Sequence, residues 1–142
     1  MSVGEMYQEA IKALAAAAMG HGVLPSPDGR AFLDNPLCGD CVEMQVKLSA
    51  GRIAALAHEV KGCLLCRAAA SVIGQRAVGA DLEAVERIST GVSKMLEKQA
   101  APPAGWEELG AFAPVHEHRS RYRCVELPFQ ALVAALQEAG KK

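Results

Sequence analysis

The segment CVEMQVKLSAGRIAALAHEV, residues 41–60, contains the clearest structural pattern in the chain. Apolar and polar residues alternate in its first half: Val42, Met44, Val46 and Leu48 are apolar, and Glu43, Gln45, Lys47 and Ser49 are polar. Such alternation is typical of a strand with one buried face, because successive side chains point to opposite faces. Ala50-Gly51 predicts a tight turn, and RIAALAHEV (52–60) a second strand. The segment therefore predicts an antiparallel hairpin.

Helical patterns surround this hairpin on both sides. Apolar residues recur at helical spacing over residues 4–19, from Gly62-Cys63 to near Gly79, and again after Asp81, which suits a helix N-cap. RAFLDN (30–35) predicts a short edge strand, and the charged segment HEHRSRYRC (116–124) a connector. Pro128 suits the first turn of a last helix. The order of these elements predicts an α+β domain in which several helices pack against a small antiparallel sheet.

Length, charge and cysteine content narrow the class of protein. A chain of 142 residues is most simply one domain, spanning residues 1–142. A net charge of −1 gives no basic surface for nucleic acid. No apolar run reaches the roughly 20 residues that span a bilayer, and no signal peptide is recognisable, so we expect no membrane partner and a cytoplasmic location. In that compartment, five cysteines indicate ligands or reactive thiols rather than disulfides.

The cysteines allow two different metal sites. Two CxxC pairs resemble the four-thiolate pattern of a zinc ribbon, which would make the protein a structural zinc-binding interaction module; the pairs are Cys38 with Cys41 and Cys63 with Cys66. The other site combines one carboxylate with three thiolates: Cys38, Asp40, Cys63 and Cys124. We expect Cys63 and Cys124 to lie near helix N-termini, where the helix dipole favours the thiolate that binds metal. This second set suits zinc or an iron–sulfur cluster.

Three segments carry a resemblance to a known family. DNPLCGDCVEMQVKL (34–48), GCLLCRAAAS (62–71) and RYRCVELPFQAL (121–132) resemble the three cysteine motifs of the U-type iron–sulfur cluster scaffold proteins, the group of IscU, SufU and the NifU N-terminal domain. The resemblance implies a three-stranded sheet and a metal site made of Cys38, Asp40, Cys63 and Cys124. The long interval between Cys63 and Cys124, and Arg123 where IscU has a histidine, resemble the SufU branch in particular.

The resemblance also implies a function. A SufU-like protein binds zinc, accepts persulfide sulfur from a cysteine desulfurase, and supports assembly of a transient cluster for transfer to apo iron–sulfur proteins. It is a sulfur acceptor and scaffold rather than a conventional enzyme. We expect Cys124 to accept the sulfur and Arg123 to offset the negative charge of the ligands. The LPPVK chaperone-recognition motif of IscU is absent from this chain.

Overall fold

Three antiparallel strands form the sheet of the protein, which we describe from a computed structural model covering residues 9–36 and 39–140. The strands are β1 (Gly29–Asn35), β2 (Asp40–Ser49) and β3 (Arg52–Lys61), with β2 in the centre. Ala50 and Gly51 both have positive φ, as the two-residue turn of a tight hairpin requires. The predicted hairpin and edge strand are therefore confirmed.

The register of β2 and β3 decides which residues face the helices. Val42 lies opposite Val60, and Met44 lies opposite His58. Val42 and Met44 are completely buried on the helix-facing side, whereas the neighbouring Glu43 is only partly buried. Because side chains alternate between faces, Asp40 belongs to the same buried face as Val42, and Cys41 belongs to the other face.

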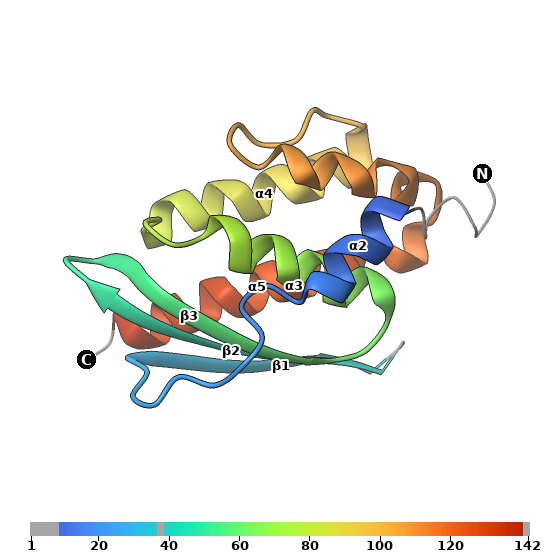
Figure 1. The fold of residues 1–142 in the computed structure, drawn as a ribbon. Helices are drawn as coiled ribbons and strands as arrows, with labels where there is room; N and C mark the ends of the chain where they lie inside the picture. The colour runs from blue at the N-terminus through green and yellow to red at the C-terminus, as the bar shows by residue number, and fades with distance from the viewer. Residues whose placement is uncertain (1–8, 37–38, 141–142) are drawn as a thin grey trace.

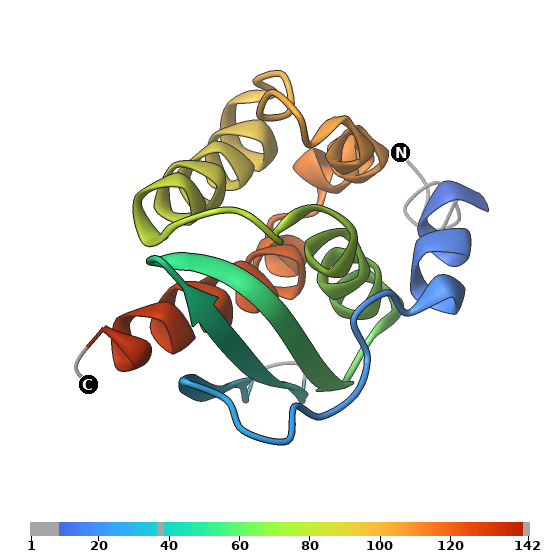
Figure 2. The ribbon, with the colours of Figure 1, turned by 60° about the vertical axis from the view of Figure 1, so that its left-hand side comes forward.

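The helices cover one face of the sheet (Figures 1 and 2). Five segments make this layer: α2 (Glu9–Ala17), α3 (Leu64–Arg76), α4 (Leu82–Lys98), the 3₁₀ helix η1 (Glu107–Glu117) and α5 (Tyr122–Ala139). Helix α5 contacts both β1 and β2, and it also contacts α3 and α4. The approach of α5 to β1 requires Gly29, because a Cβ atom there would overlap the carbonyl oxygen of Ala135. The α+β fold with a small three-stranded antiparallel sheet is confirmed.

The core is built largely from small and branched side chains. Ala68, Ala69 and Ala70 of α3 are completely buried, so this helix can pack closely against its neighbours. Aromatic rings are few, but Trp106 and Phe129 contact each other, with ring centroids 5.9 Å apart. Cys66 and Cys124 are also completely buried in this core. Within the described residues, none of the helices combines the length and apolar character needed to cross a membrane.

Two helix starts allow a comparison with expectation. Asp81 caps α4 as predicted, because its side chain accepts a hydrogen bond from the backbone N–H of Ala84 at 2.9 Å. The expected start of the last helix near Pro128 is wrong, since α5 begins at Tyr122 and Pro128 lies inside it. The predicted charged connector is instead the end of η1, the short 3₁₀ helix η2 (Arg119–Arg121), and the first turn of α5.

The physical reason for the earlier helix start is the apolar face that begins before Pro128. Cys124, Val125 and Leu127 are already buried, so folding this segment as helix covers apolar surface. Pro128 has no N–H, but in α5 this removes only the donor that would face the carbonyl of Cys124. A hydrogen bond of 2.6 Å from the Tyr122 hydroxyl to the His116 carbonyl secures the preceding segment.

Candidate metal centre

Three segments that are far apart in sequence meet at one end of the molecule. These are the start of β2, the junction of β3 with α3, and the start of α5 (Figure 1). They bring Asp40, Cys63 and Cys124 together, so that one potential ligand atom of each lies within 4.8 Å of the others. Among the described residues, this is the group of histidine, cysteine and acidic side chains that could hold a metal ion.

Asp40 is the buried carboxylate of this site. It has no solvent exposure, and its Oδ1 accepts a hydrogen bond of 2.8 Å from the backbone N–H of Cys63. Cys63 is the N-cap residue of α3, and its own side chain makes no capping hydrogen bond. Asp40 therefore caps α3 from a different element, because its carboxylate accepts from an amide at the positive end of the helix.

Gly62 makes this contact sterically possible. A Cβ atom at position 62 would overlap Oδ1 of Asp40. Gly62 therefore leaves space for the Asp40 carboxylate, and Cys63 supplies both the backbone N–H that Asp40 binds and a thiol. The Sγ of Cys63 lies 3.6 Å from Oδ2 of Asp40, so the thiol can donate to the second carboxylate oxygen.

The two described thiols of the site have different acidities in the metal-free protein. A hydrogen bond from the Cys124 thiol lowers the pKa of Cys63 to about 7; burial opposes this, and the backbone N–H of Cys66 supports it. The pKa of Cys124 is strongly raised, because its thiol donates to Cys63 and is buried close to Asp40. Cys124 is completely buried, whereas Cys63 is partly exposed. The Cys63 thiolate therefore accepts a hydrogen bond from the Cys124 thiol, and the proton stays on Cys124.

The donor set suits a four-coordinate metal ion. Zinc–sulfur bonds of about 2.3 Å and zinc–oxygen bonds of about 2.0 Å place the tetrahedral ligand atoms of such a site roughly 3.5–3.8 Å apart. The separations in the site, all within 4.8 Å, need only small side-chain movements to reach that geometry. The predicted fourth ligand, Cys38, lies outside the described residues, two positions before Asp40 in the sequence.

The other predicted residues are arranged differently. Cys41 is partly exposed and lies on the opposite face of β2 from Asp40. Cys66 is completely buried in the core, in the first turn of α3. These positions do not favour the four-thiolate ribbon. Arg123 is exposed in the first turn of α5, next in sequence to Cys124, and its predicted influence on the site stays a prediction.

Sequence reasoning placed Asp40 among the candidate ligands, which stays a prediction, but it missed the role of Asp40 as a cap. Asp40 and Cys63 are 23 residues apart, and no local signal links a carboxylate to a helix start at that separation. Gly62 was the available signal, because glycine permits another group to approach the backbone closely.

Comparison with known proteins agrees with this architecture. A family model described as the NifU-like N-terminal domain matches residues 6–113, which include Asp40 and Cys63 and stop before Cys124. The iron–sulfur cluster assembly scaffold protein IscU of Streptococcus pyogenes serotype M1 is 28% identical over 123 residues, covering 84% of this chain and 76% of that protein. The zinc-dependent sulfurtransferase SufU of Bacillus subtilis (strain 168) is 28% identical over 111 residues, 76% of each chain.

A solved structure is similar along nearly the whole chain. The N-terminal part of a nitrogen-fixing NifU-like protein from Brucella abortus superposes with a TM-score of 0.92 at 26% identity, covering 99% of this chain and 98% of that one. The family match spans well over half of the sequence, and the fold agrees with it. The chain therefore belongs to the NifU-like N-terminal domain family, the family of the IscU and SufU iron–sulfur cluster assembly proteins.

Proposed function

We propose that this protein acts in iron–sulfur cluster biogenesis as a zinc-binding acceptor of persulfide sulfur, and that it supports assembly of a cluster for transfer to apo iron–sulfur proteins. The sulfur donor is a cysteine desulfurase, and the setting is the cytoplasm. The observation that carries the proposal is the convergence of Asp40, Cys63 and Cys124 in a family whose members include a scaffold protein and a zinc-dependent sulfurtransferase.

Zinc would be held by Cys38, Asp40, Cys63 and Cys124. When bound, the metal keeps its thiolate ligands deprotonated near neutral pH. The iron–sulfur cluster is cargo that would use the same donor atoms. Thiolates are soft ligands that suit zinc and iron–sulfur clusters, whereas a carboxylate is a harder ligand. Asp40 is therefore the ligand most easily released, which suits a site that must open for sulfur or give up a cluster.

Cys124 is the proposed sulfur acceptor. Its thiolate attacks the outer sulfur of the partner's persulfide, a new S–S bond forms on Cys124, and the partner's cysteine leaves as a thiolate. Since Cys124 is buried, the first turn of α5 must open for this step. Pro128 favours that opening, because it cannot donate the hydrogen bond that a residue at 128 would otherwise give to the carbonyl of Cys124.

Two neighbours of Cys124 assist in this proposal. Cys63, within 4.8 Å of Cys124, would hold the metal together with it, and a metal held there would keep Cys124 as the thiolate that attack requires. Arg123 adds a positive charge beside the acceptor and helps to offset a ligand set whose negative charge exceeds that of Zn²⁺.

A structural zinc module built on Cys38, Cys41, Cys63 and Cys66 is the rival function. It requires Cys41, on the opposite face of β2 from Asp40, and Cys66, in the buried core, to converge on one ion with Cys63, and the positions of Cys41 and Cys66 oppose this. Zinc content cannot distinguish the two proposals, because each holds one ion.

Sulfur transfer distinguishes them directly. The zinc-loaded protein is incubated with a cysteine desulfurase and cysteine, alkylated and digested, and the added sulfur is located by mass spectrometry. We expect a persulfide on Cys124 in the wild-type protein and in the Cys41→Ser control. A Cys124→Ser variant that accepts sulfur undiminished, or sulfur found only on Cys63 or Cys38, would contradict the assignment. A wild-type protein that accepts no sulfur would favour the structural module.

A further inference from the structure

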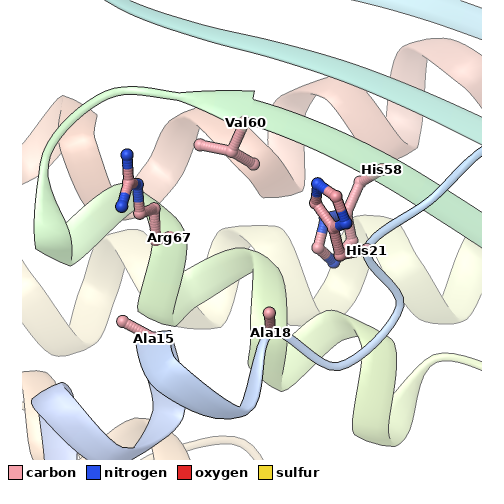
Figure 3. A pocket seen from close by; sticks show the side chains of 6 residues that line it. All are labelled: Ala15, Ala18, His21, His58, Val60 and Arg67. Atoms are coloured by element: carbon pink, nitrogen blue, oxygen red, sulfur yellow. The ribbon is translucent and has the colours of Figure 1, made fainter.

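The two edges of the sheet are protected differently. On the outer side of β3, the loop around His21 makes two backbone hydrogen bonds, of 2.9 and 3.0 Å, with His58 (Figure 3). The loop that precedes α4 makes two more, of 2.8 and 2.9 Å, with Ile53. On the outer side of β1, the Glu138 carboxylate accepts a hydrogen bond of 3.1 Å from the backbone N–H of Arg30. Within the described residues, the edge of β3 is therefore covered at two places by backbone, and the edge of β1 is covered at one end by a single side chain.

The rest of the β1 edge presents open backbone groups. In an antiparallel ladder, residues that bond to the neighbouring strand alternate with residues whose N–H and C=O point away from it. The N–H of Arg30 points away from β2, so the same groups of Phe32 and Asp34 also point outward. In residues 9–36 and 39–140, no other segment forms a hydrogen bond with Phe32 or Asp34 on that side. An open edge of this kind is a template for pairing with another strand.

Phe32 lies at the centre of this open edge. It is 64% exposed, and it lies opposite Glu43 of β2, so its ring belongs to the face of the sheet that the helices leave uncovered. A single exposed apolar side chain is common on protein surfaces. At the centre of an edge strand, however, proteins usually place a charge or a proline that discourages pairing. The phenyl ring of Phe32 does the opposite, because pairing with another strand would bury it.

The sequence of the edge is complementary to itself in the antiparallel direction. If Phe32 of one copy lies opposite Phe32 of a second copy, Arg30 of each copy lies opposite Asp34 of the other. Asp34 is exposed and has no ion pair among the described residues. Arg30 binds Glu43 at 2.9 Å, and its guanidinium has further N–H donors for a second carboxylate. Opposite charges and aromatic rings that face each other across two strands both stabilise a sheet.

We propose that two copies of this protein associate through their β1 edges, antiparallel and centred on Phe32, into one continuous six-stranded sheet. A self-complementary edge is what a two-fold symmetric dimer requires. The outward groups of Phe32, together with the Asp34 N–H and the Arg30 C=O, supply roughly four backbone hydrogen bonds across the axis. The inference goes beyond the proposed function and does not depend on it.

The arrangement keeps both metal centres accessible. The candidate metal centre lies at the end of the sheet where Asn35 of β1 is paired with Asp40. Because the two β1 strands run in opposite directions, this end of one copy lies beside the Gly29 end of the other. The two metal centres therefore lie at opposite ends of the joined sheet, and each stays open to other proteins.

Sedimentation velocity of the zinc-loaded protein, between about 5 and 500 µM, tests the proposal. We expect the wild-type protein to change from monomer towards dimer over this range, because one short strand per copy buries less surface than most stable dimers do. Phe32→Glu should associate at least about tenfold more weakly, since it places two carboxylates opposite each other. Val23→Glu is the matched control, because Val23 is also 64% exposed but lies outside the sheet, and it should associate like the wild-type protein. Zinc content and far-UV circular dichroism verify that the site and the fold are intact.

Charge complementation tests the register. Arg30→Glu places like charges opposite each other in both halves of the dimer, and so does Asp34→Arg. Each variant alone should therefore associate at least about tenfold more weakly than the wild-type protein. An equimolar mixture of the two variants restores both opposite-charge pairs, so we expect the mixture to recover most of the association.

Amide hydrogen exchange locates the interface. As the protein concentration rises, exchange of the N–H groups of Phe32 and Asp34 should slow, because these groups become bonded to the second copy. The N–H groups of Ala31 and Leu33 point to β2 and should change little.

Each contrary result has a distinct meaning. A wild-type protein that stays monomeric, or a dimer that survives Phe32→Glu and both charge variants, would overturn the inference and leave the proposed function untouched, because sulfur acceptance is measured separately. If Val23→Glu also abolishes association, the copies adhere through apolar surface in general, and the inference is wrong. If the wild-type protein stays monomeric but an added cysteine desulfurase slows exchange at Phe32, the edge binds that partner and not a second copy, which also overturns the inference.

Discussion

Asp40 has two roles that one pair of substitutions can separate. Its Oδ1 caps α3 through the 2.8 Å hydrogen bond from the Cys63 amide, and its carboxylate is a proposed metal ligand. Asp40→Ala removes both roles. Asp40→Asn keeps an oxygen that can accept the amide hydrogen bond, but it replaces the anionic ligand with a neutral amide, which is a much weaker donor to zinc.

The magnitude follows from the burial of this contact. A hydrogen bond to a charged group contributes about 1.5–3 kcal/mol, and loss of a helix cap typically costs about 1 kcal/mol. Removing the carboxylate also relieves its repulsion of the Cys63 thiolate, so we expect Asp40→Ala to lower the free energy of unfolding of the metal-free protein by about 1–2 kcal/mol. For a domain of this size, that corresponds to a decrease in Tm of about 3–8 °C. Asp40→Asn should lose less than half of this.

The zinc-loaded proteins should behave differently. Loss even of a residue that only supports a metal ligand typically weakens metal binding about 10–100-fold, so both variants should transfer zinc to a chromophoric chelator at least about tenfold faster than the wild-type protein. Thermal unfolding after exhaustive chelation measures the cap, and the rate of zinc transfer measures the ligand. Asp34→Asn, an exposed carboxylate on β1, is the control for loss of one negative charge.

Two outcomes would refute this reasoning. If the metal-free Asp40→Asn protein is destabilised as much as Asp40→Ala, the amide oxygen does not replace the cap, and the hydrogen bond to Cys63 is not the source of stability. If zinc leaves both variants at the wild-type rate, Asp40 is not a ligand.

Three further predictions concern the same site. Serine variants of the predicted ligands Cys38, Cys63 and Cys124 should each lose most of the zinc, whereas the Cys41→Ser and Cys66→Ser variants should retain it. Metal analysis after gel filtration measures the zinc content. Loss of zinc from the Cys41→Ser and Cys66→Ser variants would support the zinc ribbon. Gly62→Ala should lower the Tm and accelerate zinc release, because the added Cβ displaces Asp40, and an unchanged Tm and zinc release rate would contradict the close packing. In the metal-free protein, the rate of Cys63 alkylation by iodoacetamide, measured by peptide mapping, should fall as the pH decreases through about 7. Cys124→Ala should move the midpoint of this pH profile upward, because the hydrogen bond that lowers the pKa of Cys63 is lost. A midpoint that does not move would refute the assignment of that hydrogen bond.

The elements that the sequence predicted well are those controlled by local rules. The alternation from Val42 to Leu48 specifies a strand because the side-chain period of a strand is two, and Ala50-Gly51 suits a tight hairpin turn. Asp81 was predictable as an N-cap because a capping side chain bonds to an amide only three residues away. The family motifs were also recognisable from the sequence, because each motif is a short continuous segment and the three occur in a characteristic order along the chain.

The prediction for the last helix was wrong because two local signals were misleading. The charges of HEHRSRYR resemble a solvated connector, and Pro128 resembles a helix start. Burial of Cys124, Val125 and Leu127 against the rest of the core favours helix from Tyr122 onward, and the proline costs only one donor there. Tertiary packing therefore outweighs the local preference of this segment.

The sequence by itself determined the hairpin, the α+β class and the identity of the chemical groups available to the site, because side-chain periodicity and residue type act over a few neighbouring positions. Only the tertiary structure decided that Asp40 caps the helix that Cys63 begins and that Cys124 is buried beside them. These contacts join residues that are tens of positions apart, and they form because packing α3 and α5 against the sheet brings the start of β2 and the starts of both helices to one end of the molecule.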